Sequence, residues 1–191
     1  MLVVLASVSL EAQSRTFDVG RSATADDIRA LGSAIAPDGA GLPAGSGTVA
    51  EGRALFKDRC ARCHGAQGEG GIGARLVGGQ GTLATPKPIK TVGSFWPYAT
   101  TLWDYINRAM PYDEPGRLSP SEVYAAAAFV LHLNNIVPED TRLDATSLLA
   151  VKMPNRNGFV PDSRPDVGPT ATGGPGRSAP AASQPEPQRS R

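Results

Sequence analysis

The sequence has 191 residues, enough for one domain with appendages, and its 19 Lys and Arg against 18 Asp and Glu give a net charge of +1. This near-neutral balance provides no electrostatic reason to expect binding to nucleic acid or to an anionic membrane surface. The 22 glycines and 17 prolines predict a large share of loop, linker or tail. Only 6% of the residues are aromatic. We therefore expect a small core of apolar side chains, which a non-protein group helps to fill.

The N-terminus carries the only long apolar run, residues 2–10, which is shorter than the ~20 residues of a membrane-spanning helix. The run leads to Ala12, a small residue of the kind that precedes a signal-peptidase cut. We interpret residues 1–12 as an export signal and expect a periplasmic protein without a transmembrane anchor. No Lys or Arg precedes Arg15, so a misassigned start codon or an ordinary buried strand are the alternatives.

Composition divides the rest of the chain into four parts. Residues 13–47 are predicted to form an N-terminal arm or linker, with one short helix that Thr24 caps and that has Asp26 and Asp27 in its first turn. Residues 48–137 form the candidate domain. Residues 138–160 are interpreted as a strap that contacts a partner subunit. Residues 161–191 are rich in proline and glycine and lack aromatic residues, so we expect a disordered tail.

Two helices can be placed in the first part of the domain. Thr48 and Glu51 have the spacing of a capping box, which predicts a helix that runs to about Cys60. Thr100 or Thr101 is expected to cap a second helix, which should stop before Pro111 because the residue preceding a proline disfavours helix.

A third helix is predicted after Ser119, the expected N-cap, with Pro120 in the first helical position and Glu122 three residues after the cap. No segment alternates like a β-strand. The sequence therefore predicts an all-α domain with long loops.

The only two cysteines of the chain lie in the motif Cys60-Ala61-Arg62-Cys63-His64. This Cys-x-x-Cys-His pattern is the attachment signature of c-type haem. Two thiols about one helical turn apart can form thioethers with the two vinyl groups on one edge of the porphyrin. His64 then follows directly as an axial ligand of the iron. We therefore predict one covalent haem c.

The sequence of this region allows four other interpretations. A thioredoxin-like pair needs a βαβ context, and a zinc site needs two more ligands when only His132 is left. A simple disulfide leaves His64 unexplained. The segment from Gly68 to Gly73 matches the G-x-G-x-x-G pattern of nucleotide-binding loops, but no strand is predicted before it. We expect its glycines to let the backbone approach the macrocycle closely.

A six-coordinate haem needs a second axial ligand, for which methionine and histidine are usual. Met110, Met153 and His132 are the candidates once Met1 leaves with the signal. We favour Met110, which follows a helix and precedes Pro111 on a segment free to fold across the second haem face. Met153 lies beyond the compact domain, and His132 lies inside a helix. His/Met ligation in an apolar pocket raises the reduction potential, which suits an electron acceptor.

Five aromatic residues gather between positions 95 and 105. We interpret Phe95 and Trp103 as packing residues. Trp96 and Tyr98 also carry polar groups that could donate hydrogen bonds to haem propionates.

With these residues identified, the chain resembles class I cytochromes c. Gly52 and Phe56 match the glycine–aromatic pattern of the family, in which the first helix crosses the C-terminal one, here near Phe129. The stretches 91–111, 118–124 and 152–156 are similar to the cytochrome subunit of bacterial sulfite or sulfane dehydrogenases. The resemblance implies a fold of three to four short helices around one covalently bound haem, with extended N- and C-terminal arms.

In that family a molybdenum-cofactor subunit oxidises the sulfur substrate, and the cytochrome passes electrons to a downstream cytochrome or oxidase. The resemblance implies attachment through Cys60 and Cys63, with His64 as proximal and Met110 as distal ligand. Some members carry two haem domains, whereas this chain has one motif, which favours sulfite over sulfane. The usual Gly-Pro after the motif is here Gly73-Ala74, so the carbonyl that orients His64 lacks the stiffness of proline.

We therefore expect an electron-transfer subunit that is not catalytic alone. Arg62, Lys87, Lys90 and Arg108 are candidates to line the docking face at the exposed haem edge, although nine basic and seven acidic residues in the domain give no strong net charge. A generic carrier, the cytochrome subunit of another dehydrogenase, and a haem sensor or enzyme with an open iron site are the alternatives.

Overall fold

The computed structural model describes residues 20–30 and 34–160, which fall into two units divided after Ala34. The expected signal (1–12) and tail (161–191) lie outside the described residues. The first unit contains helix α1 (Ala25–Ala30), in which the backbone N–H of Asp27 donates to the Thr24 hydroxyl at 3.1 Å. The predicted cap of this short helix is therefore confirmed.

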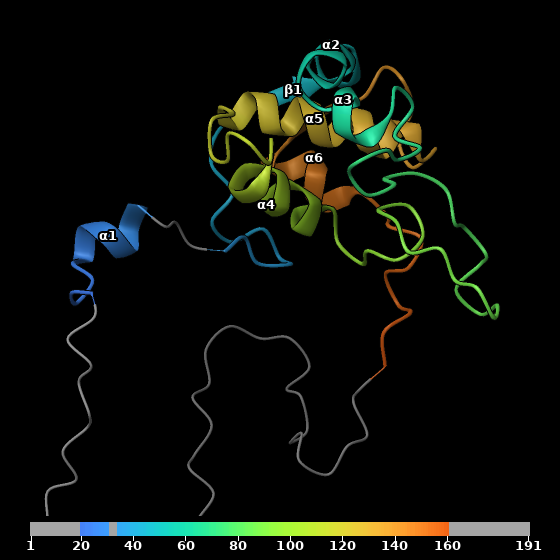
Figure 1. The fold of residues 1–191 in the computed structure, drawn as a ribbon, viewed down its shortest axis with the longest axis horizontal. Helices are drawn as coiled ribbons and strands as arrows, with labels where there is room; N and C mark the ends of the chain where they lie inside the picture. Colours follow the sequence, from blue (N-terminus) through green and yellow to red (C-terminus); the bar gives the residue numbers. More distant parts are fainter. Residues whose placement is uncertain (1–19, 31–33, 161–191) are drawn as a thin grey trace, which may run out of the picture. The chain divides into compact units, whose positions relative to one another are not determined.

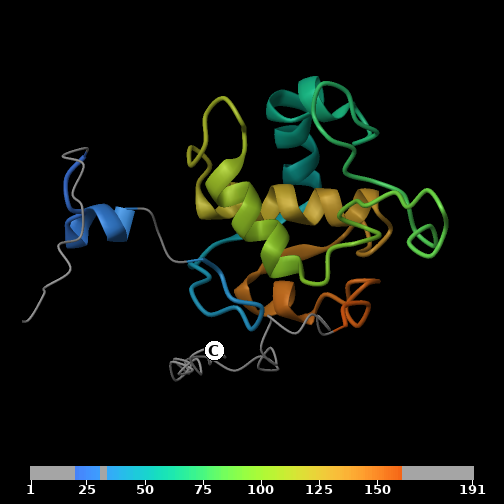
Figure 2. The same ribbon diagram turned by 60° about the horizontal axis from the view of Figure 1, so that its bottom comes forward.

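The centre of the second unit is helix α5 (Pro120–Leu133), with α2, α4 and α6 arranged around it (Figures 1 and 2). All nine residues from 123 to 131 are buried. The helix begins as predicted, because the Ser119 side chain accepts a hydrogen bond from the Glu122 backbone and the Glu122 carboxylate accepts one from the Ser119 backbone.

Helix α2 (Val49–Arg59) also begins with its predicted capping box, formed by Thr48 and Glu51. It packs directly on α5, because a Cβ on Gly52 would lie 1.9 Å from the carbonyl oxygen of Ala125. The rings of Phe56 and Phe129 meet edge to face with centroids 5.2 Å apart. The crossing expected from the family pattern is thus present.

Helix α4 (Ala99–Ala109) ends at its C-cap Met110, just before Pro111, as predicted. Its N-cap differs from the prediction, because Tyr98 rather than Thr100 or Thr101 takes that position. Thr100 instead lies in the first turn, where it is 2% exposed. The buried face of the helix starts at Ala99, so the packing of this face, and not a side-chain cap, sets where the helix begins.

Two short strands were not predicted. β1 (Ser46–Thr48) pairs antiparallel with β2 (Arg142–Asp144), with Gly47 opposite Leu143. Three residues are too few to show the alternation that identifies a strand in a sequence. Apart from these strands, the regular structure of the described residues is helical, as predicted.

The segment 138–160 packs on the chain's own core. It contributes β2 and helix α6 (Ala145–Ala150), and its Leu143, Leu148 and Met153 are only 1–3% exposed. The inner face of this segment completes the domain, and its predicted contact with a partner subunit stays a prediction. None of the helices in the described part of the chain is long and apolar enough to cross a membrane.

Candidate functional site

The Cys-x-x-Cys-His motif forms a single helical turn directly after α2. Cys60 ends α2 and precedes α3 (Ala61–His64), so both thiols and the imidazole are held on one short, ordered segment. Both cysteines are half-buried and free. Burial raises the pKa of the Cys60 thiol to about 11, whereas a redox-active pair needs a lowered pKa. This environment disfavours the thioredoxin-like interpretation.

The ring of His64 is oriented by a backbone carbonyl. Its Nδ1 atom lies 2.6 Å from the carbonyl oxygen of Ala74. Since a carbonyl can only accept, Nδ1 donates, and the lone pair of the neutral ring is on Nε2, free to bind a metal. The orienting carbonyl expected after the motif is therefore present, although alanine takes the place of proline.

The glycine-rich loop closes tightly on the motif. A Cβ on Gly73 would lie 3.0 Å from Cε1 of His64, and one on Gly71 would lie 2.8 Å from the carbonyl oxygen of Cys63. The Gly73 N–H donates to that same carbonyl at 2.8 Å. The loop follows helix α3 and not a strand, which disfavours nucleotide binding. Its glycines permit a close approach to the His64 ring and the Cys63 backbone.

Two ion pairs join the segment after Met110 to the end of α2 and to the motif helix α3. Arg59 Nη1 lies 3.2 Å from Glu114 Oε2, and Arg62 pairs with Asp113. The guanidinium of Arg62 also lowers the pKa of the Asp113 carboxyl. Met110 itself is half-buried at the edge of the core. The predicted distal ligand therefore lies on a segment that contacts the helices carrying the thiols and the imidazole.

The two alternative ligands are engaged elsewhere. Met153 is 3% exposed and belongs to the hydrophobic core. His132 Nδ1 lies 3.2 Å from the carbonyl oxygen of Val137, and its Nε2 lies 3.5 Å from the Glu139 carboxylate. Both ring nitrogens of His132 thus face protein oxygens, so Met110 remains the best candidate.

The two aromatic residues expected to contact haem propionates have protein neighbours. Trp96 packs edge-on against Tyr105, with centroids 5.7 Å apart. The guanidinium carbon of Arg156 lies 4.1 Å from the ring centroid of Tyr98. Their contact with propionates stays a prediction.

The packing role predicted for Trp103 and Phe95 fits the structure. Trp103 is 1% exposed and packs on Tyr124, and the Phe95 ring lies 5.1 Å from that of Phe159. Sequence reasoning missed that the Nε1 of Trp103 and the hydroxyl of Thr100 are buried without a hydrogen-bond partner. Only the tertiary structure reveals such atoms, because both residues look like ordinary helix positions in the sequence.

The four basic residues predicted to form a docking face have different environments. Arg62 pairs with Asp113, and Arg108 pairs with Asp104 at 3.0 Å. Lys90 lies over the Phe95 ring, while Lys87 is exposed. Two of the four charges are thus partly neutralised within the chain, and a uniformly basic face does not result.

Comparison with solved structures gives a match to the crystal structure of the sulfane dehydrogenase SoxCD from Paracoccus pantotrophus. The match has 40% sequence identity and a TM-score of 0.70, and it covers 91% of this chain and 87% of that chain. The chain belongs to the cytochrome c family. Residues 47–130 of this cytochrome also match the family of subunit III of cbb3-type cytochrome c oxidases. A search of curated proteins gave no match.

Membership of this family implies a covalent haem c and an electron-carrier function. The residues present in the cytochrome fit that group. The thiols of Cys60 and Cys63 are free, and the Nδ1 hydrogen bond of His64 leaves Nε2 available. Half-buried apolar side chains at the edge of the core, including Leu76 and Met110, offer apolar contacts of the kind a porphyrin requires.

Proposed function

We propose that this cytochrome is an exported, periplasmic subunit with one haem that accepts electrons from a molybdenum-containing, sulfur-oxidising dehydrogenase subunit. It passes them to a downstream cytochrome or oxidase and is not catalytic alone. The observation that carries the proposal is the extent of the SoxCD match, 91% of the chain at 40% identity. The oxidase-subunit match spans only residues 47–130 and by itself supports no more than a general carrier.

Haem c supplies an iron that takes up and releases one electron at a time. In the proposed arrangement Cys60 and Cys63 would hold the macrocycle covalently, and His64 would bind the iron through Nε2. The Ala74 carbonyl fixes the ring orientation of His64 through Nδ1. Met110 would be the second protein ligand of the iron and would keep small molecules away from it, which separates a carrier from a sensor or enzyme with an open site.

The sulfur substrate of the partner is assigned to the sulfane class. The single haem motif favoured sulfite, because some sulfane-type cytochromes carry two haem domains. The matched protein is a sulfane dehydrogenase, and 87% of its matched chain aligns with this single-motif sequence. One motif therefore does not argue against a sulfane partner, and the overall match supports it.

The outer face of segment 138–160 is the proposed contact with the dehydrogenase subunit. Its inner residues, such as Leu143, belong to the core, but Leu149 and Phe159 are 46% and 54% exposed. Exposed apolar side chains on an ordered segment are typical of subunit interfaces.

Co-expression tests the proposal. The tagged cytochrome is expressed with the molybdenum subunit from the same organism, and the complex is isolated by size exclusion. We expect a stable complex that reduces an added acceptor cytochrome when a sulfane-sulfur donor is supplied. Reduction with sulfite alone would contradict the sulfane assignment. A cytochrome that elutes alone and increases no acceptor reduction would contradict the proposal.

A further inference from the structure

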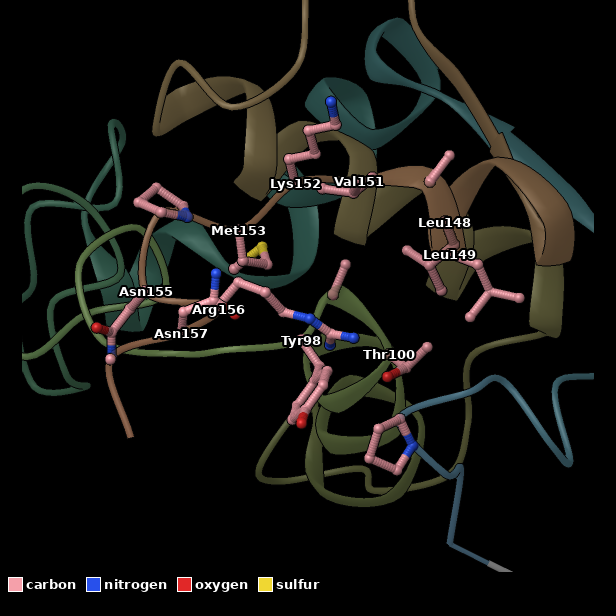
Figure 3. Close-up of a pocket in the computed structure, with 15 residues that line it drawn as sticks. Tyr98, Thr100, Leu148, Leu149, Val151, Lys152, Met153, Asn155, Arg156 and Asn157 are labelled. Atoms are coloured by element: carbon pink, nitrogen blue, oxygen red, sulfur yellow. The ribbon is translucent and has the colours of Figure 1, made fainter. Parts of the chain in front are cut away.

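A pocket of about 570 Å³ lies at the N-terminal end of α4. None of the residues of the Cys-x-x-Cys-His motif lines it. It is formed by Tyr98, Ala99 and Thr100 at the start of α4, by the last residues of α6 and by the segment that follows α6 (Figure 3). Lys152 and Arg156 belong to this segment, whereas none of the described residues that line the pocket is Asp or Glu. The pocket is therefore positively charged.

The helix end at this pocket has no side-chain cap. Tyr98 is the N-cap residue of α4, and its side chain makes no capping hydrogen bond. The first N–H groups of a helix carry partial positive charge and attract anions. A capping Ser, Thr, Asp or Asn would satisfy one of these groups, but tyrosine cannot reach back to them.

Arg156 is held at this same helix end. Its guanidinium carbon lies 4.1 Å from the centroid of the Tyr98 ring, a cation–π contact that fixes the cation beside the N-cap. Within residues 20–30 and 34–160, neither Arg156 nor Lys152 makes an ion pair. The positive end of the helix dipole repels the unpaired Arg156 guanidinium beside it, and a bound anion would relieve this repulsion.

A buried hydroxyl gives a second, independent indication of a ligand. Thr100 is 2% exposed, lines the pocket, and its Oγ1 has no hydrogen-bond partner. Figure 3 shows Thr100, Tyr98 and the Arg156 guanidinium around the same part of the pocket. A buried hydroxyl without a partner is costly, and such groups are normally satisfied by protein, water or a ligand.

The geometry points to a binding site for a small oxyanion of the sulfate class in this pocket. The anion would accept hydrogen bonds from the Thr100 hydroxyl and the N-terminal N–H groups of α4, and Arg156 would neutralise part of its charge. The inference does not rest on the proposed electron-transfer role.

The test is a titration of the reduced holoprotein with sodium sulfate, at ionic strength held constant with sodium chloride. Two-dimensional NMR would follow the backbone amides of Ala99 and Thr100. We expect saturable shifts at these amides, and affinity about tenfold weaker in Arg156→Gln, because one charge-assisted contact is lost. Arg117→Gln is the matched control, since Arg117 is exposed and does not line the pocket.

Thr100→Val separates ligand binding from folding. Without sulfate this variant should be at least as stable as the native protein, because a buried hydroxyl without a partner is removed. With sulfate it should bind more weakly. Absence of saturable shifts in the native protein, or equal affinity in Arg156→Gln and Arg117→Gln, would overturn the proposal whatever the haem does.

Discussion

The Nδ1 atom of His64 lies 2.6 Å from the carbonyl oxygen of Ala74. This contact joins the motif helix to the glycine-rich loop ten residues later, and it decides which ring nitrogen faces the haem side. In many cytochromes of this class a proline holds that loop. Here the tight packing of Gly71 and Gly73 on the motif holds it instead.

Gly73→Ala should disturb this arrangement. The added Cβ would lie 3.0 Å from His64 Cε1 and 3.2 Å from the Cys63 carbonyl oxygen, so the ring or the loop must move. Overpacking of this kind costs ~1–3 kcal/mol, and we expect a lower melting temperature and a shifted reduction potential. Ala74→Ser is the control, since the exposed Ala74 contributes only its backbone carbonyl. A variant with unchanged potential and stability would show that the loop is not fixed by this contact.

Substitution of Met110 and of Met153 should distinguish a ligand of the iron from a residue that packs in the core. Met110→Ala should abolish the near-infrared absorption band of the methionine–iron bond and open the reduced iron to rapid carbon monoxide binding. Met153→Ala should keep the band but lower the free energy of unfolding by about 2–5 kcal/mol, because Met153 is 3% exposed in the core. Loss of the band in Met153→Ala alone would reverse the assignment.

The N-cap of α5 should give a pH-dependent contribution to stability. Hydrogen bonds from the backbone and side chain of Ser119 lower the pKa of Glu122. A lowered carboxyl pKa means that the stabilisation is complete above the ordinary glutamate pKa of about 4.3 and is lost as the pH falls through the folded-state pKa. Ser119→Ala should cost about 1 kcal/mol near neutral pH.

Urea unfolding at neutral and acid pH measures this contribution. The difference between native protein and Ser119→Ala should shrink in acid, where Glu122 is protonated in both. Ser121→Ala is the comparison, since Ser121 lies on the same helix turn and its hydroxyl accepts only a hydrogen bond from the Ser46 N–H, so the cost of this change should not depend on pH. A cost independent of pH would contradict the assigned role of the Glu122 carboxylate.

Substitutions on the inner and outer faces of the segment 138–160 should have different effects. Leu143→Ala should destabilise the protein by about 2–5 kcal/mol, because Leu143 is 1% exposed. Leu149→Asp should leave the haem spectrum and the unfolding midpoint nearly unchanged, yet weaken co-purification with the dehydrogenase subunit. Normal co-purification of Leu149→Asp and of Phe159→Asp would contradict the proposed interface.

Much of the helical framework follows from local sequence signals. The capping boxes at Thr48 and Ser119 and the stop at Pro111 depend on neighbouring residues, so they are readable without a structure. The N-cap at Tyr98 and the strand pair that joins Gly47 to Leu143 depend on tertiary packing across many residues, and sequence reasoning missed them.

The same distinction between local signals and tertiary contacts applies to the candidate site. Cys60, Cys63 and His64 are adjacent in the sequence, and their chemistry is evident from spacing alone. The ion pairs that hold the Met110 segment against the motif join residues more than fifty positions apart. The Thr100 hydroxyl has no hydrogen-bond partner because Thr100 is buried. Its burial could not be predicted, since threonine is a polar residue that is usually exposed.

The most direct test of the account is the rate of haem reduction in the oxidised cytochrome, followed optically after mixing with a sulfane-sulfur donor or with sulfite. The measurement is made with the cytochrome alone and with its molybdenum subunit. The account predicts rapid haem reduction only with the subunit present. With the subunit, haem reduction should be slower in the Leu149→Asp variant than in the native cytochrome. Equal rates with and without the subunit, or no reduction in either case, would contradict the proposed electron donor.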